Sequence, residues 1–150
     1  MGSVSIIERE MTEAEFARMK AGFDEHTTEN GNPVETAKRF GFVVMDGERF
    51  VGCSSGLAYS SEQGYNNYFF LSDLFVDREY RRRGLGTAVL RQLEKKVAAL
   101  GIRYIWTWTA AYDGHEFYRK QGYNVFCEQE GWYATGHSRF GMRKSLVQER

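Results

Sequence analysis

The sequence predicts a single domain of mixed α/β (α+β) class, and three observations lead to that prediction. The chain has 150 residues, a length that suits one domain with one hydrophobic core. Its composition is 42% hydrophobic and 15% aromatic, which is typical of a globular fold rich in strands. Short apolar segments of strand length alternate with segments whose apolar residues recur at helical spacing. We therefore expect residues 1–150 to form one domain.

A strand, a helix and a loop are expected in the N-terminal region. Residues 4–8 alternate enough between apolar and polar types to form a first strand. Thr12 can cap a helix, because Glu15 stands three residues later as its capping-box partner. The polar, glycine-bearing segment 26–33 is predicted to be a loop or a short irregular helix. The helix before it presents an apolar face formed by Phe16, Met19 and Phe23.

Two strands joined by a tight turn are expected next, followed by a central strand. Residues 39–45 and 50–59 have strand character, and Asp46-Gly47 between them is a strong hairpin signal. A second turn is predicted at residues 60–67. Residues 68–76 are almost continuously apolar, which predicts a central strand buried on both faces.

A long amphipathic helix and several shorter elements complete the chain. Residues 85–100 carry one apolar stripe, and Gly101 is placed to end this helix as a capping glycine. The elements expected after it are a strand at 104–109, a short helix around 116–120, and strands at 123–128 and 138–145.

The most informative motif is the turn between the central strand and the long helix, Arg81-Arg82-Arg83-Gly84-Leu85-Gly86-Thr87. The first N–H groups of a helix have no partner inside it, and the helix dipole adds about half a positive charge there. Glycines allow a phosphate to approach the backbone closely. The turn therefore predicts a binding site for a phosphate ligand such as a pyrophosphate.

Other interpretations of this turn are weaker. A run of arginines is by itself usually a solvated surface segment. The turn has neither the Gly-Lys-Ser/Thr sequence of the nucleotide P-loop nor the third glycine of the dinucleotide fingerprint. A nucleic-acid-binding role is disfavoured, because the formal net charge is zero and such proteins usually carry a basic excess.

Two motifs together resemble the GNAT (GCN5-related) N-acetyltransferases. Arg81-x-x-Gly84-x-Gly86 matches the Q/R-x-x-G-x-G/A signature with which that family binds the pyrophosphate of acetyl-coenzyme A (acetyl-CoA). Phe117-Tyr118-x-x-x-Gly122-Tyr123 is similar to the family's F-Y-x-x-x-G-F/Y motif. The resemblance covers roughly residues 4–146. It implies the GNAT fold, a central, twisted, mixed and mostly antiparallel sheet with helices on both faces.

The resemblance also implies where acetyl-CoA binds. The backbone of residues 74–76 would bind the pantetheine arm and polarise the thioester carbonyl, as an oxyanion hole does. Tyr118 would protonate the leaving thiolate, and Ala111 stands where the family often has an asparagine that contacts the cofactor arm. The expected acetyl-CoA-binding residues are Leu74, Phe75, Val76, Arg81, Arg82, Arg83, Gly84, Leu85, Gly86, Thr87 and Tyr118.

Asp73 is the candidate residue for the acceptor amine, because it is a carboxylate within an otherwise apolar strand. Ser72-Asp73-Leu74-Phe75-Val76 resembles the acid-Asp-Phe-Phe-Val stretch of diamine acetyltransferases, in which the acids bind the polyamine and the first is the base. Here Ser72 occupies that first position. The alternative interpretation of Asp73 is a structural carboxylate that pairs with a backbone group or an arginine.

Acidic segments with aromatic neighbours predict a small cationic acceptor. Residues 24–29 and 128–133 are acidic, and the resemblance implies that these regions select the acceptor. An aminoglycoside antibiotic is the first candidate, and a polyamine also fits. The alternatives are a protein, peptide or amino-acid N-acetyltransferase and a non-catalytic acyl-CoA-binding sensor. The expected acceptor-binding residues are Asp73, Glu25, Glu128, Glu130 and Trp132.

Cysteine and histidine are too scattered to predict a disulfide or a metal site. The N-terminus has no apolar signal segment and no apolar run approaches membrane length, so we expect a cytoplasmic protein without a membrane partner. Dimers are frequent among GNAT enzymes, which makes a homodimer an expectation by analogy.

Overall fold

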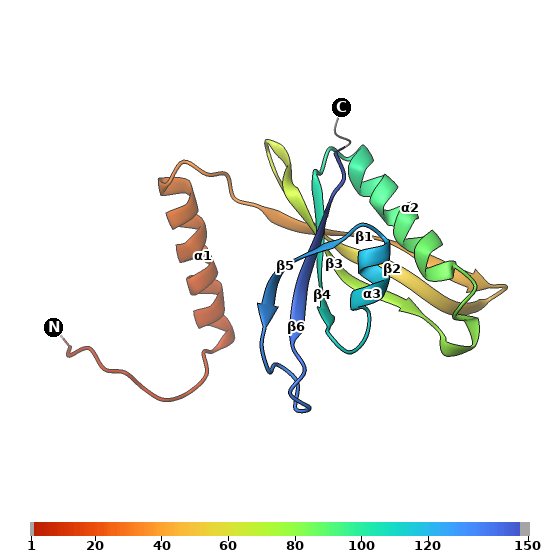
Figure 1. The fold of residues 1–150 in the computed structure, drawn as a ribbon. Helices are drawn as coiled ribbons and strands as arrows, with labels where there is room; N and C mark the ends of the chain where they lie inside the picture. Colours follow the sequence, from red (N-terminus) through yellow and green to blue (C-terminus); the bar gives the residue numbers. More distant parts are fainter. Residues whose placement is uncertain (1, 148–150) are drawn as a thin grey trace. The chain divides into compact units, whose positions relative to one another are not determined.

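The computed structural model describes residues 2–147 of the chain (Figure 1). The chain forms two compact units, Met1–Val34 and Glu35–Arg150. The first unit contains one helix, and the second contains the sheet and the remaining helices. The expectation of a single domain over residues 1–150 stays a prediction.

The first unit is built around helix α1 (Glu13–Glu29). The predicted capping box is confirmed, because the Glu15 N–H donates to Thr12 Oγ1 at 3.2 Å and the Thr12 N–H donates to Glu15 Oε1 at 2.8 Å. Arg9 binds the same carboxylate at 2.7 Å. The Arg9 hydrogen bond, helped by those of Thr12, lowers the pKa of Glu15 to about 2.

Two predictions for this unit need correction. Residues 4–8 form no strand. The described part of the unit has no second strand, so a strand at 4–8 would find no hydrogen-bond partners within it. The regular helix also extends to Glu29, into the segment predicted to be a loop or a short irregular helix. It ends at Asn30, whose side-chain amide donates to the His26 carbonyl at 2.8 Å and so satisfies a terminal helix carbonyl.

The second unit contains a six-stranded sheet with the strand order β1-β2-β3-β4-β6-β5. Only β3 and β4 pair in parallel, and every other neighbouring pair is antiparallel, which confirms a mixed and mostly antiparallel sheet. The predicted β1–β2 turn is confirmed, and its Gly47 has a φ of +60°. The strands are β1 (Thr36–Asp46), β2 (Arg49–Ser61), β3 (Gly64–Val76), β4 (Tyr104–Ala110), β5 (Asn124–Gln129) and β6 (Arg139–Ser145).

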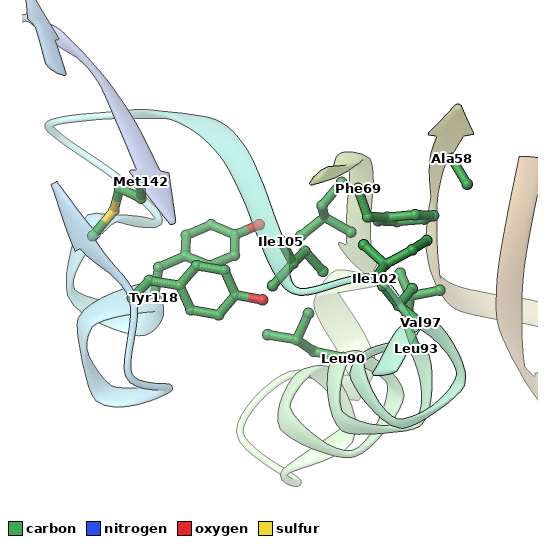
Figure 2. Close-up of a cluster of buried hydrophobic side chains, with 11 residues drawn as sticks. Ala58, Phe69, Leu90, Leu93, Val97, Ile102, Ile105, Tyr118 and Met142 are labelled. Atoms are coloured by element: carbon green, nitrogen blue, oxygen red, sulfur yellow. The ribbon is translucent and has the colours of Figure 1, made fainter. Parts of the chain in front are cut away.

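Helices α2 (Leu85–Ala99) and α3 (His115–Lys120) lie on the same face of this sheet, here called the inner face (Figure 1). The short 3-10 turn η1 (Arg78–Tyr80) precedes α2, and Gly101 ends α2 with a φ of +84°, as predicted. Figure 2 shows the core that α2, α3 and the sheet share. Its members are Ala58, Phe69, Leu71, Leu90, Leu93, Val97, Ile102, Ile105, Tyr118, Tyr123 and Met142.

Strand β3 is buried on the inner face and exposed on the opposite face, here called the outer face. Phe69 and Leu71 are at most 1% exposed, whereas Tyr68 is 41% and Phe75 is 45% exposed. The prediction of burial on both faces is therefore wrong for this unit. The outward aromatic rings stack across strands, as Tyr68 does on Tyr104 at 4.9 Å. Both helices of the unit lie on the inner face, so a helix on the outer face stays a prediction.

Candidate active site

Strands β3 and β4 part after a short parallel pairing. They pair only at residues 68–70 with 104–106. At the point of divergence the buried Thr107 hydroxyl donates to the Leu71 carbonyl at 2.9 Å, so a side chain replaces a backbone donor. Beyond this point the two strands do not pair with each other. We call this opening the β3–β4 fork, formed by residues 71–76 and 107–110.

A β-bulge at Ser72 bends β3 where the fork opens. Ser55 of β2 pairs with Asp73, whereas the next residue of β2 pairs with Leu71, so Ser72 is an extra residue. Residues 74–76 continue to pair with β2 on one side. Their other side has no strand beside it. An extended ligand could therefore bind there as a strand does, through backbone hydrogen bonds.

The turn before α2 leaves the start of that helix uncovered. Its N-cap residue Gly84 has a φ of +76°, and no side chain caps the helix. Arg82 also has a positive φ, of 65°. The N–H groups of the first helical turn therefore lack a side-chain acceptor, and the positive end of the helix dipole lies beside them. This geometry suits an anionic ligand.

Gly86 lies where the three predicted parts of the site meet. A Cβ atom on Gly86 would lie 3.7 Å from Val76 Cγ2 and 3.6 Å from the ring of Phe117. Val76 is the last residue of β3, and Phe117 is the neighbour of Tyr118 in α3. The start of α2, the open edge of β3 and helix α3 therefore come within contact distance of one another.

Two of the three arginines bind the turn itself. Arg81 Nε donates to the Val76 carbonyl at 3.1 Å, and Arg83 Nη2 donates to the Glu79 carbonyl at 3.4 Å. The Arg83 guanidinium also lies 5.0 Å from the Tyr80 ring. These side chains therefore help to shape the turn, in addition to the positive charge that they bring to the start of α2.

Tyr118 is a buried tyrosine of α3, 7% exposed, and its ring belongs to the core cluster of Figure 2. Burial raises the pKa of Tyr118 to about 12, against a smaller opposing effect of a hydrogen bond with the Thr107 side chain. The phenol therefore stays protonated at neutral pH. Because Thr107 lies where the strands part, the Tyr118 hydroxyl lies at the closed end of the fork, on its inner side.

Asp73 lies on the outer face of the sheet, and its carboxylate is paired with Arg39. Its carboxylate accepts hydrogen bonds from Arg39 Nη2 at 3.2 Å and from the Ser72 hydroxyl at 2.6 Å. Arg39 also donates to the Ser55 hydroxyl at 2.9 Å. The side chain of Asp73 is 60% exposed, so the carboxylate is not buried. The pairing with an arginine is the structural alternative that the sequence left open, and a role toward the amine stays a prediction.

The remaining predicted acceptor residues belong to different units of the chain. Glu128 is in β5, and Glu130 and Trp132 are in the segment between β5 and β6. Neither of these two acids forms an ion pair with any residue in the described range 2–147. Glu25 belongs to α1 in the first unit, where it lies 3.7 Å from Arg18. Glu128, Glu130 and Trp132 are therefore neighbours in the chain within the second unit, whereas Glu25 belongs to the first unit.

Sequence reasoning missed two residues at the fork. Thr107 was not singled out, because a threonine in a strand carries no signal of its hydrogen bond to another strand. Arg139, the first residue of β6, has its guanidinium carbon 4.1 Å from the Trp108 ring and 3.8 Å from the Trp132 ring. Because successive strand residues point to opposite faces, the sequence could have predicted that Arg139 and Phe140 lie on different faces of the sheet. It could not have shown that the indole rings of Trp108 and Trp132 pack against Arg139.

Residues 2–147 contain no cluster of three or more histidine, cysteine or acidic side chains that could hold a metal ion. Among the same residues, no helix is long and apolar enough to cross a membrane.

Comparison with known proteins agrees with this geometry. The model of the Acetyltransferase (GNAT) family matches residues 4–123. A comparison with curated protein sequences found no match. An acetyltransferase from Bacillus cereus shares the fold with a TM-score of 0.77 at 23% identity, covering 94% of this chain and 97% of that one. An aminoglycoside 6'-N-acetyltransferase in complex with coenzyme A has a TM-score of 0.63 at 20% identity, covering 91% and 89%.

Solved structures of another GNAT subtype are also similar. Ard1 from Thermoplasma volcanium has a TM-score of 0.57 at 16% identity, covering 71% of this chain and 70% of that one. At these identities the structures show a shared fold only. The match of the family model over most of the chain shows more: this protein belongs to the GNAT acetyltransferase family. It is an acetyl-CoA-dependent N-acetyltransferase, that is, an acyltransferase that uses acetyl-CoA and an acceptor.

Proposed function

We propose that acetyl transfer to a primary amine takes place in the β3–β4 fork. The convergence at Gly86 is the observation that carries this proposal, since one residue at the start of α2 lies within contact distance of both the end of β3 and helix α3. We assign the start of α2 the role of anion site, the open edge of β3 that of binding the pantetheine arm, and Tyr118 of α3 that of proton donor. Amine acetylation needs these parts, because the donor must be held, its carbonyl polarised and its thiolate protonated.

The residues present fit acetyl-CoA. The uncapped N–H groups of residues 84–87 would hold the pyrophosphate, with charge from Arg81 and Arg83, and the backbone of residues 74–76 would hold the pantetheine arm. When bound, acetyl-CoA supplies an activated acetyl group. The main-chain N–H groups along the open edge of β3 would polarise its carbonyl, which is the role of an oxyanion hole.

Tyr118 is proposed to donate a proton to the departing thiolate. Its hydroxyl lies at the closed end of the fork, and its raised pKa keeps it in the donor form throughout the physiological range. A phenol is a weak acid, so Tyr118 would contribute mainly because it is always protonated and is correctly placed, and less because of its acid strength. The Thr107 side chain lies beside this hydroxyl and is itself fixed by its hydrogen bond to the Leu71 carbonyl at 2.9 Å.

Two acceptor classes remain candidates. A small polycationic amine of the aminoglycoside type, the first candidate, is supported by the exposed acids Glu128 and Glu130, which precede Trp132 in the chain. That support is weaker than the sequence suggested, because Asp73 is neutralised by Arg39. An amino-acid or peptide amine is the second candidate, and the Arg139 guanidinium favours it. A cytoplasmic location and a homodimer stay predictions.

A thiol-release assay with acetyl-CoA and a panel of amines tests the proposal. The panel contains aminoglycosides, polyamines, amino acids and peptides, each with a matched compound that lacks the primary amine. We expect amine-dependent release of coenzyme A with at least one class and none with the compounds that lack the amine. Acetyl-CoA binding without turnover on any amine would instead identify a non-catalytic acyl-CoA-binding protein.

A further inference from the structure

The guanidinium of Arg139 is held on the outer face by two indole rings. Its carbon lies 4.1 Å from the centre of the Trp108 ring and 3.8 Å from that of Trp132. Trp108 alternates along β4 with the buried inner-face residues Ile105 and Thr107, so it belongs to the outer face. It also lies in the part of β4 that has left β3. Arg139 therefore lies beside the open arm of the fork.

Most hydrogen-bond donors of Arg139 are free. Arg139 Nε donates to Gln129 Oε1 at 2.8 Å, which is its only side-chain hydrogen bond among residues 2–147. In the same range no acidic side chain forms an ion pair with it. No buried side-chain nitrogen or oxygen in the described residues lacks a partner, so the terminal nitrogens of Arg139 reach solvent. A guanidinium has five N–H donors, and four of them remain for a ligand.

The segment that carries Trp132 is itself ordered by local contacts. The Tyr133 N–H donates to the His137 carbonyl at 3.1 Å, and the Gly136 N–H donates to the Tyr133 carbonyl at 2.8 Å. The Tyr112 ring packs against Tyr133 at 5.1 Å and against His137 at 5.2 Å. Gln129 and Arg139 also pair across β5 and β6. The guanidinium is therefore held in one geometry before any ligand binds, which reduces the entropy lost on binding.

We propose that Arg139 binds the carboxylate of the acceptor, so that the acceptor is a small molecule or peptide end that carries both an amine and a carboxylate. Stacking on the indoles uses the faces of the guanidinium and leaves the N–H groups at its edge. A planar carboxylate is the group that accepts two parallel hydrogen bonds from such an edge. Binding of the carboxylate by Arg139 does not depend on the proposed function, whereas acetylation of the amine of the same molecule does.

The placement of the two groups agrees with such an acceptor. Arg139 lies on the outer face and pairs with Ala110, in the arm of the fork that β4 forms, whereas Tyr118 lies on the inner face of the sheet. A carboxylate bound by Arg139 would direct the amine of the same molecule into the fork, toward the side on which the thiolate is protonated. A polycation without a carboxylate would instead meet the positive charge of Arg139 and would offer no acceptor for its free N–H groups.

Ligand binding tests the carboxylate site independently of turnover. Tryptophan fluorescence would be titrated with N-acetylglycine and N-acetyl-L-lysine, and with the carboxamide of each, because Trp108 and Trp132 flank the guanidinium. We expect the acids to bind roughly tenfold or more tightly than the amides, as charged hydrogen bonds allow. Arg139→Gln should remove this preference. Arg143→Gln is the matched control, because Arg143 lies on the same strand with its guanidinium 5.3 Å from the Phe126 ring. Equal binding of acids and amides by the wild type would overturn the inference.

Turnover then separates the two proposals. Thiol release is measured with glycine, L-lysine and a dipeptide, each against its carboxamide. We expect the acids to be favoured by the wild type and by Arg143→Gln, with that preference lost in Arg139→Gln. If the amides turn over as well as the acids in all three proteins, the carboxylate site is wrong and the acetyltransferase site stands. If the acids bind but no amine is acetylated, the carboxylate site stands and the proposed function is wrong.

Discussion

Tyr118 shows at the scale of one residue how burial prepares a group for chemistry. Its side chain lies in the shared core, and desolvation raises its pKa. The hydroxyl therefore stays protonated at pH values at which an exposed tyrosine would already be ionised. The same burial has a measurable effect on stability, because the unfolded chain ionises this tyrosine near its usual pKa of about 10.

We expect Tyr118 to make stability pH-dependent above pH 10. Its folded-state pKa of about 12 exceeds the unfolded value, so its contribution is complete below pH 10 and is lost as pH rises toward 12. At pH 11 the free energy of unfolding should have fallen by about 1 kcal/mol from this residue alone. The measurement is chemical denaturation of the wild type and Tyr118→Phe at pH 8 and 11. A stability difference between the two proteins that does not change with pH would contradict the assignment.

Glu94 is another buried ionisable group, and it links α2 with β6. It accepts hydrogen bonds from the Tyr123 hydroxyl at 2.8 Å and from Lys144 Nζ at 3.0 Å, and it is 7% exposed. Glu94→Ala should destabilise the protein by about 2–4 kcal/mol, because it leaves the buried Tyr123 hydroxyl without an acceptor. Glu94→Gln should cost less, since an amide oxygen still accepts one bond. Urea denaturation measures both, with the exposed Glu116→Ala as a control.

At the scale of elements, the turn before α2 separates two uses of glycine. Gly84 is needed for its backbone, since its φ of +76° is unfavourable for any residue with a Cβ atom. Gly86 is a matter of size, since a Cβ there would already be in van der Waals contact with Val76 and Phe117 at 3.6–3.7 Å, and we expect a larger side chain to overpack this contact.

Substitutions at the two glycines should therefore differ in their effect on acetyl-CoA affinity. We expect Gly86→Ala to bind acetyl-CoA nearly as the wild type does, and Gly86→Val to abolish binding. Gly84→Val should also abolish binding, because it forces the turn to another conformation. Isothermal titration calorimetry measures the Kd values, and circular dichroism checks that each variant is folded. Wild-type affinity in both valine variants would place acetyl-CoA elsewhere.

The sheet contributes a feature that no single strand contains. A bulge at Ser72, a short parallel pairing and the Thr107 hydroxyl together open the β3–β4 fork. None of these has a signal in the local sequence, because each depends on which strands become neighbours. The segments that follow the two arms of the fork, by contrast, carry recognisable motifs at residues 81–87 and 117–123.

At the scale of the whole molecule, features that depend on neighbouring residues could be predicted from the sequence, and features that depend on contacts between distant segments could not. The Thr12 cap, the turn at Gly47 and the end of α2 at Gly101 depend on neighbouring residues, and all three are confirmed. The strand at residues 4–8 was wrong, because alternation alone does not supply a pairing partner. The prediction that β3 is buried on both faces was wrong for the second unit. Apolar character alone does not show which aromatic rings pack against the helices on the inner face and which stack on the outer face.

The acceptor region shows the same limit. The acids at Glu128 and Glu130 are visible in the sequence, and they suggested a cationic acceptor. The neutralisation of Asp73 by Arg39 and the placement of Arg139 against two indoles depend on contacts between distant strands. Those contacts shift the proposed acceptor toward an amine that also carries a carboxylate.

Single-turnover thiol release by Tyr118→Phe tests the central claim, that the fork is the site of acetyl transfer, most directly. The substitution removes one hydroxyl and keeps the ring in the core, while Thr107 retains its bond to the Leu71 carbonyl. With saturating acetyl-CoA and the best acceptor of the panel, we expect the rate to fall about 10²–10⁴-fold, the usual contribution of a general acid. The Kd for acetyl-CoA should stay within about twofold of the wild-type value. An unchanged rate with chemistry rate-limiting would contradict the claim, because the thiolate would then leave without the proton donor placed beside the fork.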